Sequence, residues 1–213
     1  MQPGIFITME GIDGAGKSTH IERLATLFRT QGRTVVVSRE PGGTPLAEKI
    51  RSVLLAERMD SLSEALLMFA SRREHIVDVI APALRRGEVV ISDRYTDSSF
   101  AYQGGGRQFD TSKLDTLEAW VQDAGADVQA VVPDLTLWFD LPAEVAAARL
   151  STARAPDKFE SESVAFFGRV IAAYARRQQQ NPSRIARIDA HQSVEDVWQQ
   201  VLRTIQQRGW GAP

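Results

Sequence analysis

Residues 5–19 read IFITMEGIDGAGKST, and this stretch decides the fold. A short apolar run rich in β-branched residues is followed at Gly11 by the pattern G-x-x-x-x-G-K-S, which leads directly into a segment with helical spacing of apolar residues. In a strand, loop and helix of this kind, glycines let backbone N–H groups turn toward phosphate oxygens, and the helix N-terminus adds a favourable dipole. The stretch therefore predicts a phosphate-binding loop for a nucleoside triphosphate.

The individual residues of this loop have different predicted roles. Lys17 is expected to neutralise the β- and γ-phosphates, and the Ser18 hydroxyl is expected to ligate Mg²⁺. The other positions expected to contact ATP are Gly11, Ile12, Asp13, Gly14, Ala15, Gly16 and Thr19. The alternative is a tight strand-to-helix turn that binds no ligand, but both flanking elements that the motif requires are present.

The rest of the chain repeats the same alternation of short strands and longer helices. Further β-branched runs occupy residues 34–37, 89–91, 135–139 and 185–188. Such alternation predicts an α/β fold, a P-loop NTPase-type three-layer sandwich with a five-stranded parallel sheet and flanking helices. The length of 213 residues suits a single domain, 1–213, and the charged excursion at about 149–160 is predicted to be a short exposed lid.

Composition excludes several classes of protein. The chain has no cysteine, which rules out thiol nucleophiles, cysteine zinc sites and disulfides. Lys and Arg total 25 against 27 Asp and Glu, so the chain lacks the basic character of nucleic-acid binders. No apolar stretch approaches a membrane span, and the first residues lack the regions of a signal peptide. We therefore expect a cytoplasmic protein with no nucleic-acid or membrane partner.

Carboxylates after the strands indicate what is done with the phosphate. A hydrolytic ATPase usually has Asp-Glu after an apolar strand, but Asp93 is followed by Arg94 and Asp140 by Leu141. A guanine-reading Asn-Lys-x-Asp string is also missing; Ser112–Asp115 opens a helix instead. Transfer to a small acceptor is therefore favoured over hydrolysis, with a nucleotide-dependent binding switch as the rival from another class.

Asp93 and Arg94 stand at the predicted carboxyl end of a buried strand, where open α/β sheets place functional groups. Asp93 is expected to reach Mg²⁺, and Arg94 to bind a second phosphate. A structural ion pair between the two is the alternative.

A long predicted helix carries a second clue. Ser61 and Glu64 form a capping-box pattern that opens a segment reaching Arg86. Its apolar stripe, interrupted by Arg73, consists of Leu62, Leu66, Phe69, Ile76, Ile80 and Leu84. Phe69 lies one turn before Arg73, so the pair could stack on a planar base and bond its carbonyl edge. Alternatively, Phe69 is core, and Arg73 points outward or pairs with an acid such as Glu40.

Two loops complete the residue-level predictions. Arg149 and Arg154, around the excursion, are either solvated or close over the triphosphate in a phosphoryl-transfer enzyme. The run Gly104–Arg107 predicts a flexible loop.

With these residues in view, the chain resembles the thymidylate kinases, nucleoside monophosphate kinases that transfer the γ-phosphoryl of ATP to dTMP. The resemblance runs from Ile5 to about Val201. It rests on the order and spacing of five motifs, Glu10–Thr19, Arg39–Thr44, Asp93–Tyr95, Ala101–Gly106 and Asp157–Glu160. It implies the nucleoside monophosphate kinase fold, a homodimer, and ATP with Mg²⁺ and dTMP as ligands.

The resemblance also implies roles for individual residues toward dTMP. Asp13 would address the sugar 3′-hydroxyl, and Tyr102 would crowd the sugar 2′ position. Phe69 would stack on thymine, Arg73 would bond its carbonyl, and Arg94 and Arg51 would bind the acceptor phosphate. The positions that match the acceptor region and the border of the base are Glu40, Pro41, Ser99 and Gln103.

The chain looks like the bacterial subtype, whose phosphate loop lacks an arginine, since Ala15 precedes Gly16. The lid must then supply the charge, and Arg149 and Arg154 are the candidates, which makes them catalytic together with Lys17 and Arg94. A kinase for another monophosphate or for a deoxynucleoside is the rival within the same class.

Overall fold

The structure is a computed structural model that describes residues 2–123, 130–150, 158–159 and 162–211. Its centre is a parallel sheet with the strand order β2-β3-β1-β4-β5. The strands are β1 (Ile5–Glu10), β2 (Val35–Arg39), β3 (Val89–Asp93), β4 (Leu135–Asp140) and β5 (Ile185–Asp189). The predicted five-stranded parallel sheet is confirmed.

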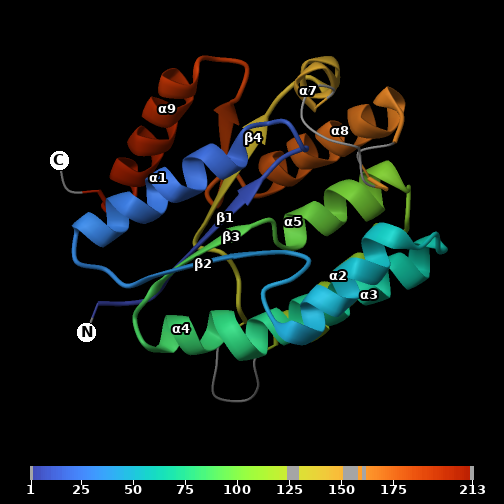
Figure 1. Ribbon diagram of the computed structural model, residues 1–213, viewed down its shortest axis with the longest axis horizontal. Coiled ribbons are helices and arrows are strands. Elements are labelled where there is room, and N and C mark those ends of the chain that lie inside the picture. Colours follow the sequence, from blue (N-terminus) through green and yellow to red (C-terminus); the bar gives the residue numbers. More distant parts are fainter. Residues whose placement is uncertain (1, 124–129, 151–157, 160–161, 212–213) are drawn as a thin grey trace.

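Helices cover both faces of this sheet (Figure 1). The α-helices are α1 (Lys17–Thr30), α2 (Pro45–Ala56), α3 (Ser61–His75), α4 (Ala81–Arg85), α5 (Thr96–Ser99), α6 (Thr111–Gln122), α7 (Ala143–Leu150), α8 (Val164–Gln180) and α9 (Val194–Gln207). Two π-helical segments, η1 (Ile76–Ile80) and η2 (Phe100–Gly106), follow α3 and α5 directly. None of the helices in the described ranges has the length and apolar composition that crossing a bilayer requires.

Alternation along β1 explains the three layers. Ile5, Ile7 and Met9 pack in one apolar cluster with residues of α1 and α9, whereas Phe6 belongs to a second cluster with residues of α3, η1 and α6. Successive side chains of a strand point to opposite faces, so a strand buried on both sides is apolar at nearly every position. Figure 1 shows α1 and α9 on one side of the sheet and α4 on the other.

The helix termini show which capping predictions hold. Ser193 caps α9 as its spacing to Asp196 predicts: its hydroxyl oxygen accepts a hydrogen bond from the Asp196 N–H at 3.2 Å. At α3 the cap is Asp60 instead of Ser61, because the Asp60 carboxylate accepts from the N–H groups of Leu62 and Ser63. A carboxylate one residue earlier fits the same role, so the helix starts at Ser61.

The long helix also differs from the predicted stripe. Leu62 and Leu66 are 45% and 49% exposed, whereas Phe69, Ile76 and Ile80 are buried. The predicted stripe thus mixed two faces of one helix. Near its end, the chain widens into the π-turn η1 just before Pro82, whose ring nitrogen cannot donate to the preceding turn.

The glycine run 104–106 is an ordered part of η2, contrary to the flexible loop that the sequence predicts. A Cβ on Gly105 would lie 2.6 Å from the Ala173 Cβ, and one on Gly106 would lie 2.4 Å from the Phe166 ring. The glycines therefore serve close packing of η2 against α8 instead of flexibility. This close contact of Gly105 and Gly106 with α8 is called the glycine seam below.

Candidate active site

The carboxyl ends of the central strands bring the predicted site together. The loop after β1 turns through Gly11, with a φ of 136°, and Gly16, with a φ of 86°, before α1 begins. A Cβ on Gly11 would lie 2.5 Å from the Phe139 carbonyl oxygen, so only glycine fits there. This turn places the N-terminus of α1 beside the end of β3.

Lys17 lies at the centre of this loop and is only 5% exposed. Its Nζ donates to the carbonyl oxygen of Gly11 at 3.3 Å, and it lies 3.9 Å from the Asp13 Oδ1 and 3.8 Å from the Asp93 Oδ1. Burial lowers the pKa of the Lys17 ammonium, Arg94 lowers it further, and the two aspartates act in the opposite direction. A buried cation with few hydrogen bonds is well suited to bind an anionic ligand.

The end of β3 offers a place for a cation ligand. The Asp93 Oδ1 is buried and accepts no hydrogen bond from any described residue. Ser18 is exposed on the first turn of α1, in the same strand-end region. Among the residues that the structure describes, no group of three or more His, Asp or Glu side chains is placed to hold a metal. Such sparse protein ligation is typical of Mg²⁺ that is held mainly by nucleotide phosphates and water.

Arg94 reaches the loop from the first residue after β3. Its backbone is left-handed, with a φ of 73°, a conformation that residues other than glycine rarely adopt and that is often found at functional sites. One terminal nitrogen donates to the Asp13 Oδ1 at 3.0 Å and to the Tyr102 hydroxyl at 3.1 Å. Asp13 thus lies between the Lys17 and Arg94 cations.

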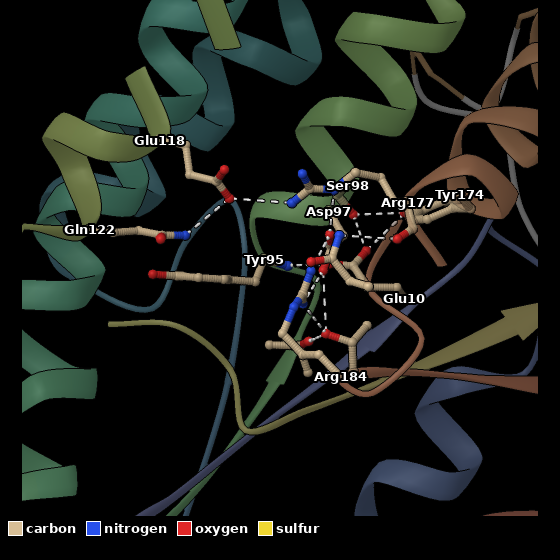
Figure 2. Close-up of polar contacts among 12 residues, drawn as sticks. Glu10, Tyr95, Asp97, Ser98, Glu118, Gln122, Tyr174, Arg177 and Arg184 are labelled. Atoms are coloured by element: carbon tan, nitrogen blue, oxygen red, sulfur yellow. Dashed lines mark hydrogen bonds and ion pairs between the residues drawn. The ribbon is translucent and has the colours of Figure 1, made fainter. Parts of the chain in front are cut away.

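Glu10 is linked to Arg94 through two shared hydroxyl groups. Its carboxylate accepts hydrogen bonds from the Tyr95 N–H at 2.7 Å, from the Tyr174 hydroxyl at 2.8 Å and from the Ser98 hydroxyl (Figure 2). The second terminal nitrogen of Arg94 donates to the same two hydroxyl groups. Burial raises the pKa of Glu10 to about 7, and the charge of Asp97 adds to this effect.

Asp97 is the buried neighbour of Glu10 and is fully paired. Arg184 donates to both its oxygens, at 2.7 and 2.9 Å, and Arg177 donates at 2.8 Å (Figure 2). Burial alone would raise the pKa of Asp97, but the two guanidinium groups hold it below its usual range. The cluster ties α5, α8 and the start of β5 together behind the site.

A cavity opens beside the phosphate loop. Eight of the ten residues predicted to bind dTMP line it, namely Asp13, Glu40, Pro41, Arg51, Arg94, Ser99, Tyr102 and Gln103. The lining residues that were not predicted to bind dTMP are Leu55, Met68, Arg72, Tyr95, Ser98 and Phe159. Arg51 also donates to the Pro41 carbonyl oxygen at 2.9 Å, which places α2 at the rim.

The structure does not bring Phe69 and Arg73 to this cavity. Phe69 is 1% exposed and packs in the apolar cluster beneath α3. Arg73 donates to the backbone carbonyls of Val121 and Asp123 on the far side of the helix. The two residues therefore do not form the predicted base-binding pair. Phe69 belongs to the hydrophobic core, and Arg73 joins α3 to α6.

Met68 and Arg72, one residue earlier, take the predicted place. They have the same spacing of four residues, and both line the cavity. Arg72 is 2% exposed and donates to the Glu40 Oε2 at 2.7 Å and to the Ser99 hydroxyl at 3.1 Å. A shift of one residue rotates a helical side chain by about 100°, which moves it to another face.

The two lid arginines have different outcomes. Arg149, on α7, donates to the carbonyl oxygens of Gly14 at 3.2 Å and Ala190 at 3.3 Å, so it stands against the phosphate loop. Arg154 lies outside the described residues, as does most of the predicted lid.

Several residues of the site carried no sequence signal. Tyr174 donates to Glu10 from a distant segment, Asp97 is held by Arg177 and Arg184 from distant segments, and Glu64 was recognised only as part of a capping pattern. Helical spacing and the resemblance both pointed to this part of α3, but a spacing of four residues fits residues 68 and 72 as well as residues 69 and 73.

Comparisons with known proteins agree with this geometry. The family model described as thymidylate kinase matches residues 9–201. A thymidylate kinase from Polaromonas sp. (strain JS666) is 57% identical over 221 aligned residues, which cover 97% of this chain and 98% of that protein. One from Verminephrobacter eiseniae is 56% identical over 215 residues and covers 100% of this chain and 95% of its own.

A solved structure shares the fold. The crystal structure of thymidylate kinase from Ehrlichia chaffeensis superposes with a TM-score of 0.74 at 35% sequence identity. The match covers 96% of this chain and 99% of that one. The likeness therefore extends over the sheet, the flanking helices and the site between them.

Proposed function

Because the chain belongs to the thymidylate kinase family and so phosphorylates dTMP to dTDP with ATP, we propose that the loop at residues 11–19 holds ATP and the adjoining cavity holds dTMP. The observation that carries this assignment is the position of Asp13, whose Oδ1 lies 3.9 Å from the Lys17 Nζ and 3.0 Å from Arg94. The donor-side and acceptor-side cations thus lie on either side of one carboxylate.

The proposed chemistry is alignment with charge neutralisation. Lys17 neutralises the β- and γ-phosphates of ATP, while Arg94 and Arg51 hold the acceptor phosphate of dTMP in line. Arg149 and Arg154 supply charge to the transferred phosphoryl group from the lid side. A dianionic acceptor phosphate needs little deprotonation, so the reaction requires no strong general base.

Mg²⁺ fits the residues present, through the Ser18 hydroxyl and the Asp93 carboxylate, one buried oxygen of which accepts no hydrogen bond from any described residue. When bound, the ion would neutralise charge between the phosphate oxygens of ATP. The remaining ligands would come from the nucleotide and water.

The base of dTMP is proposed to lie between Met68 and Arg72 on α3 and Gln103 on η2. The Met68 thioether side chain offers a polarisable apolar surface for one face of the ring. Arg72 has five N–H donors, and among the described residues three of them are bound, to Glu40, Ser99 and the Tyr95 carbonyl, which leaves two for a base carbonyl. Asp13 and Tyr102 would contact the sugar, as the resemblance implies.

The test of the nucleotide assignment is a coupled ADP-release assay with ATP, Mg²⁺ and a panel of dTMP, dUMP, dGMP and thymidine. Lys17→Ala is expected to reduce turnover with dTMP by at least about a hundredfold while the fold stays intact. Lys113→Ala, which removes a lysine from the distant helix α6, is the control. Near-normal turnover of Lys17→Ala would contradict the assigned role. ADP release that needs no acceptor would favour a nucleotide-dependent binding switch. A preference for another acceptor would favour a kinase for another monophosphate or for a deoxynucleoside.

A homodimer is proposed from the outer face of α3. Leu62 and Leu66 are 45% and 49% exposed on it, and Trp120 on α6 is 72% exposed. Arg73 bonds α6 directly, so the two helices lie side by side. Apolar side chains gathered on neighbouring helices are typical of a protein contact. Given its substrates and the lack of cysteine, we further propose that the enzyme works in the cytoplasm.

A further inference from the structure

Glu64 is a buried acid next to the proposed base site that the mechanism so far leaves unused. It sits on the first turn of α3 with 1% of its surface exposed. One carboxylate oxygen lies 3.0 Å from the Lys158 Nζ, and the other accepts from Arg107 at 3.3 Å. With a cation facing each of its oxygens, the Glu64 carboxylate acts as a hydrogen-bond acceptor.

The third partner of Glu64 is the side-chain amide of Gln103. The Gln103 Nε2 donates to the Glu64 Oε1 at 2.9 Å, and both residues are 1% exposed. Because the Glu64 carboxylate accepts this bond, Gln103 turns its NH₂ group toward α3. Its Oε1 accepts no hydrogen bond from any residue in the described ranges, and Gln103 lines the cavity. That oxygen is the polar atom that Gln103 has left for a ligand.

From this geometry we infer that Glu64 fixes the orientation of the Gln103 amide and thereby makes the base site a reader of a ring N–H. The inference rests on the proposed placement of dTMP. An acceptor at Gln103 together with the remaining Arg72 donors matches the N–H and carbonyl of thymine or uracil. Cytosine presents the reverse pattern, a ring nitrogen acceptor and an amino donor, and leaves both protein groups unpaired.

Glu64 is therefore a positioning residue that acts through Gln103. In Glu64→Gln the new amide can donate as well as accept, so Gln103 is no longer held in one orientation. Kinetics with dTMP, dCMP and N3-methyl-dTMP, which lacks the ring N–H, measure the effect. We expect the ratio of kcat/KM for dTMP over either analogue to fall about 10- to 100-fold, while the KM for ATP is unchanged.

A matched control exists in the same ionic cluster. Glu162 pairs with the Arg107 Nη1, whereas Glu64 pairs with the Nε, and no hydrogen bond between described residues joins Glu162 to Gln103. Glu162→Gln makes the same chemical change and disturbs the same cation, and it should keep the wild-type ratios. A wild-type ratio in Glu64→Gln, or an equal loss in Glu162→Gln, overturns the inference.

A second variant covers the case in which Glu64→Gln fails to fold. Gln103→Met leaves Glu64 and its cations in place and removes only the oriented amide. It should lose the same discrimination, and full discrimination in this variant overturns the inference. If the wild-type enzyme failed to use dTMP, the proposed function would fall; dTMP turnover with unchanged ratios in the variants refutes the role of Glu64 alone.

Discussion

On α3, neighbouring residues have different environments: Met68 lines the cavity and Phe69 lies in the hydrophobic core. Met68→Ala should raise the KM for dTMP about tenfold or more and leave the KM for ATP nearly unchanged, because only the cavity proposed to hold dTMP loses a lining side chain. Steady-state kinetics with each substrate varied in turn check this. Equal changes for both substrates would contradict a contact with the base.

Phe69→Ala is the paired variant one residue along the helix. Because Phe69 is 1% exposed in the apolar cluster, its truncation should lower the free energy of unfolding by about 3–5 kcal/mol. The KM for dTMP, measured well below the melting temperature, should change less than in Met68→Ala. Urea unfolding measures the first effect. A stable Phe69→Ala protein with a selective loss of dTMP binding would restore the role that the sequence predicts.

Glu10 predicts a dependence of stability on pH. Its pKa in the folded protein is about 7, raised from 4.5 by burial and by Asp97. Between these values the unfolded chain releases a proton that the folded chain keeps, so the free energy of unfolding should fall as pH rises from about 4.5 to about 7. Glu10→Gln should remove this contribution, as urea unfolding at several pH values would show.

The difference between wild type and Glu10→Gln isolates Glu10 from other groups. Burial lowers the pKa of His20, for example, which acts in the opposite sense over the upper part of this window. Glu22→Gln, on the exposed side of α1, is the control. If Glu10→Gln and wild type shared the same slope, Glu10 would be charged throughout this range.

At this scale the sequence predicted the residues with strict motifs and missed those set by packing. Lys17, Asp93 and Arg94 follow from the order of strand, glycine and helix. Glu10 was recognised only as the first residue of the motif Glu10–Thr19. Its role as a buried acceptor was not predicted, since its partners Ser98 and Tyr174 come from segments far along the chain. The prediction of Phe69 and Arg73 was wrong by one residue. Apolar residues occupy several faces of α3, so their pattern does not determine which face of the helix points toward the cavity.

Among the elements, α7 contacts the phosphate loop from a distant part of the chain. Arg149 reaches the Gly14 carbonyl from its last turn. Arg149→Ala should lower kcat by about 10- to 100-fold with little change in the KM for dTMP, because charge toward the transferred phosphoryl is lost. Arg187→Ala, which removes an exposed arginine beside Asp140, is the control. A loss confined to dTMP binding would place Arg149 on the acceptor side instead.

Elements were predicted better than their irregularities. The β-branched runs between helical patterns are sufficient to predict five strands and a parallel sheet. The π-segments η1 and η2 were not predicted, because a single widened turn leaves no periodic signal. Gly104–Gly106 was misread as a flexible loop since the close approach of α8, which requires glycine there, arises only in the folded chain.

For the whole molecule, the proposed homodimer is the clearest prediction. Leu66→Asp places a charge on the exposed face of α3 and should shift the protein to a monomer in light scattering coupled to size exclusion. Val194→Asp is the control, because Val194 is 58% exposed on α9, across the sheet from α3. A dimer that survives Leu66→Asp would place the contact elsewhere.

The single-domain organisation also remains a prediction at this scale. It implies one cooperative unfolding transition that is the same by circular dichroism and by tryptophan fluorescence. Two separate transitions would contradict it.

The glycine seam joins these scales. Helix α8 rests on Gly105 and Gly106, and the same helix carries Tyr174, which bonds both Glu10 and Arg94. A methyl group on either glycine would have to push α8 away from η2, and the displacement would reach the Tyr174 hydroxyl, which accepts a hydrogen bond from the Arg94 guanidinium. Two residues that contribute no side chain to the site thus control how accurately the Arg94 guanidinium is positioned.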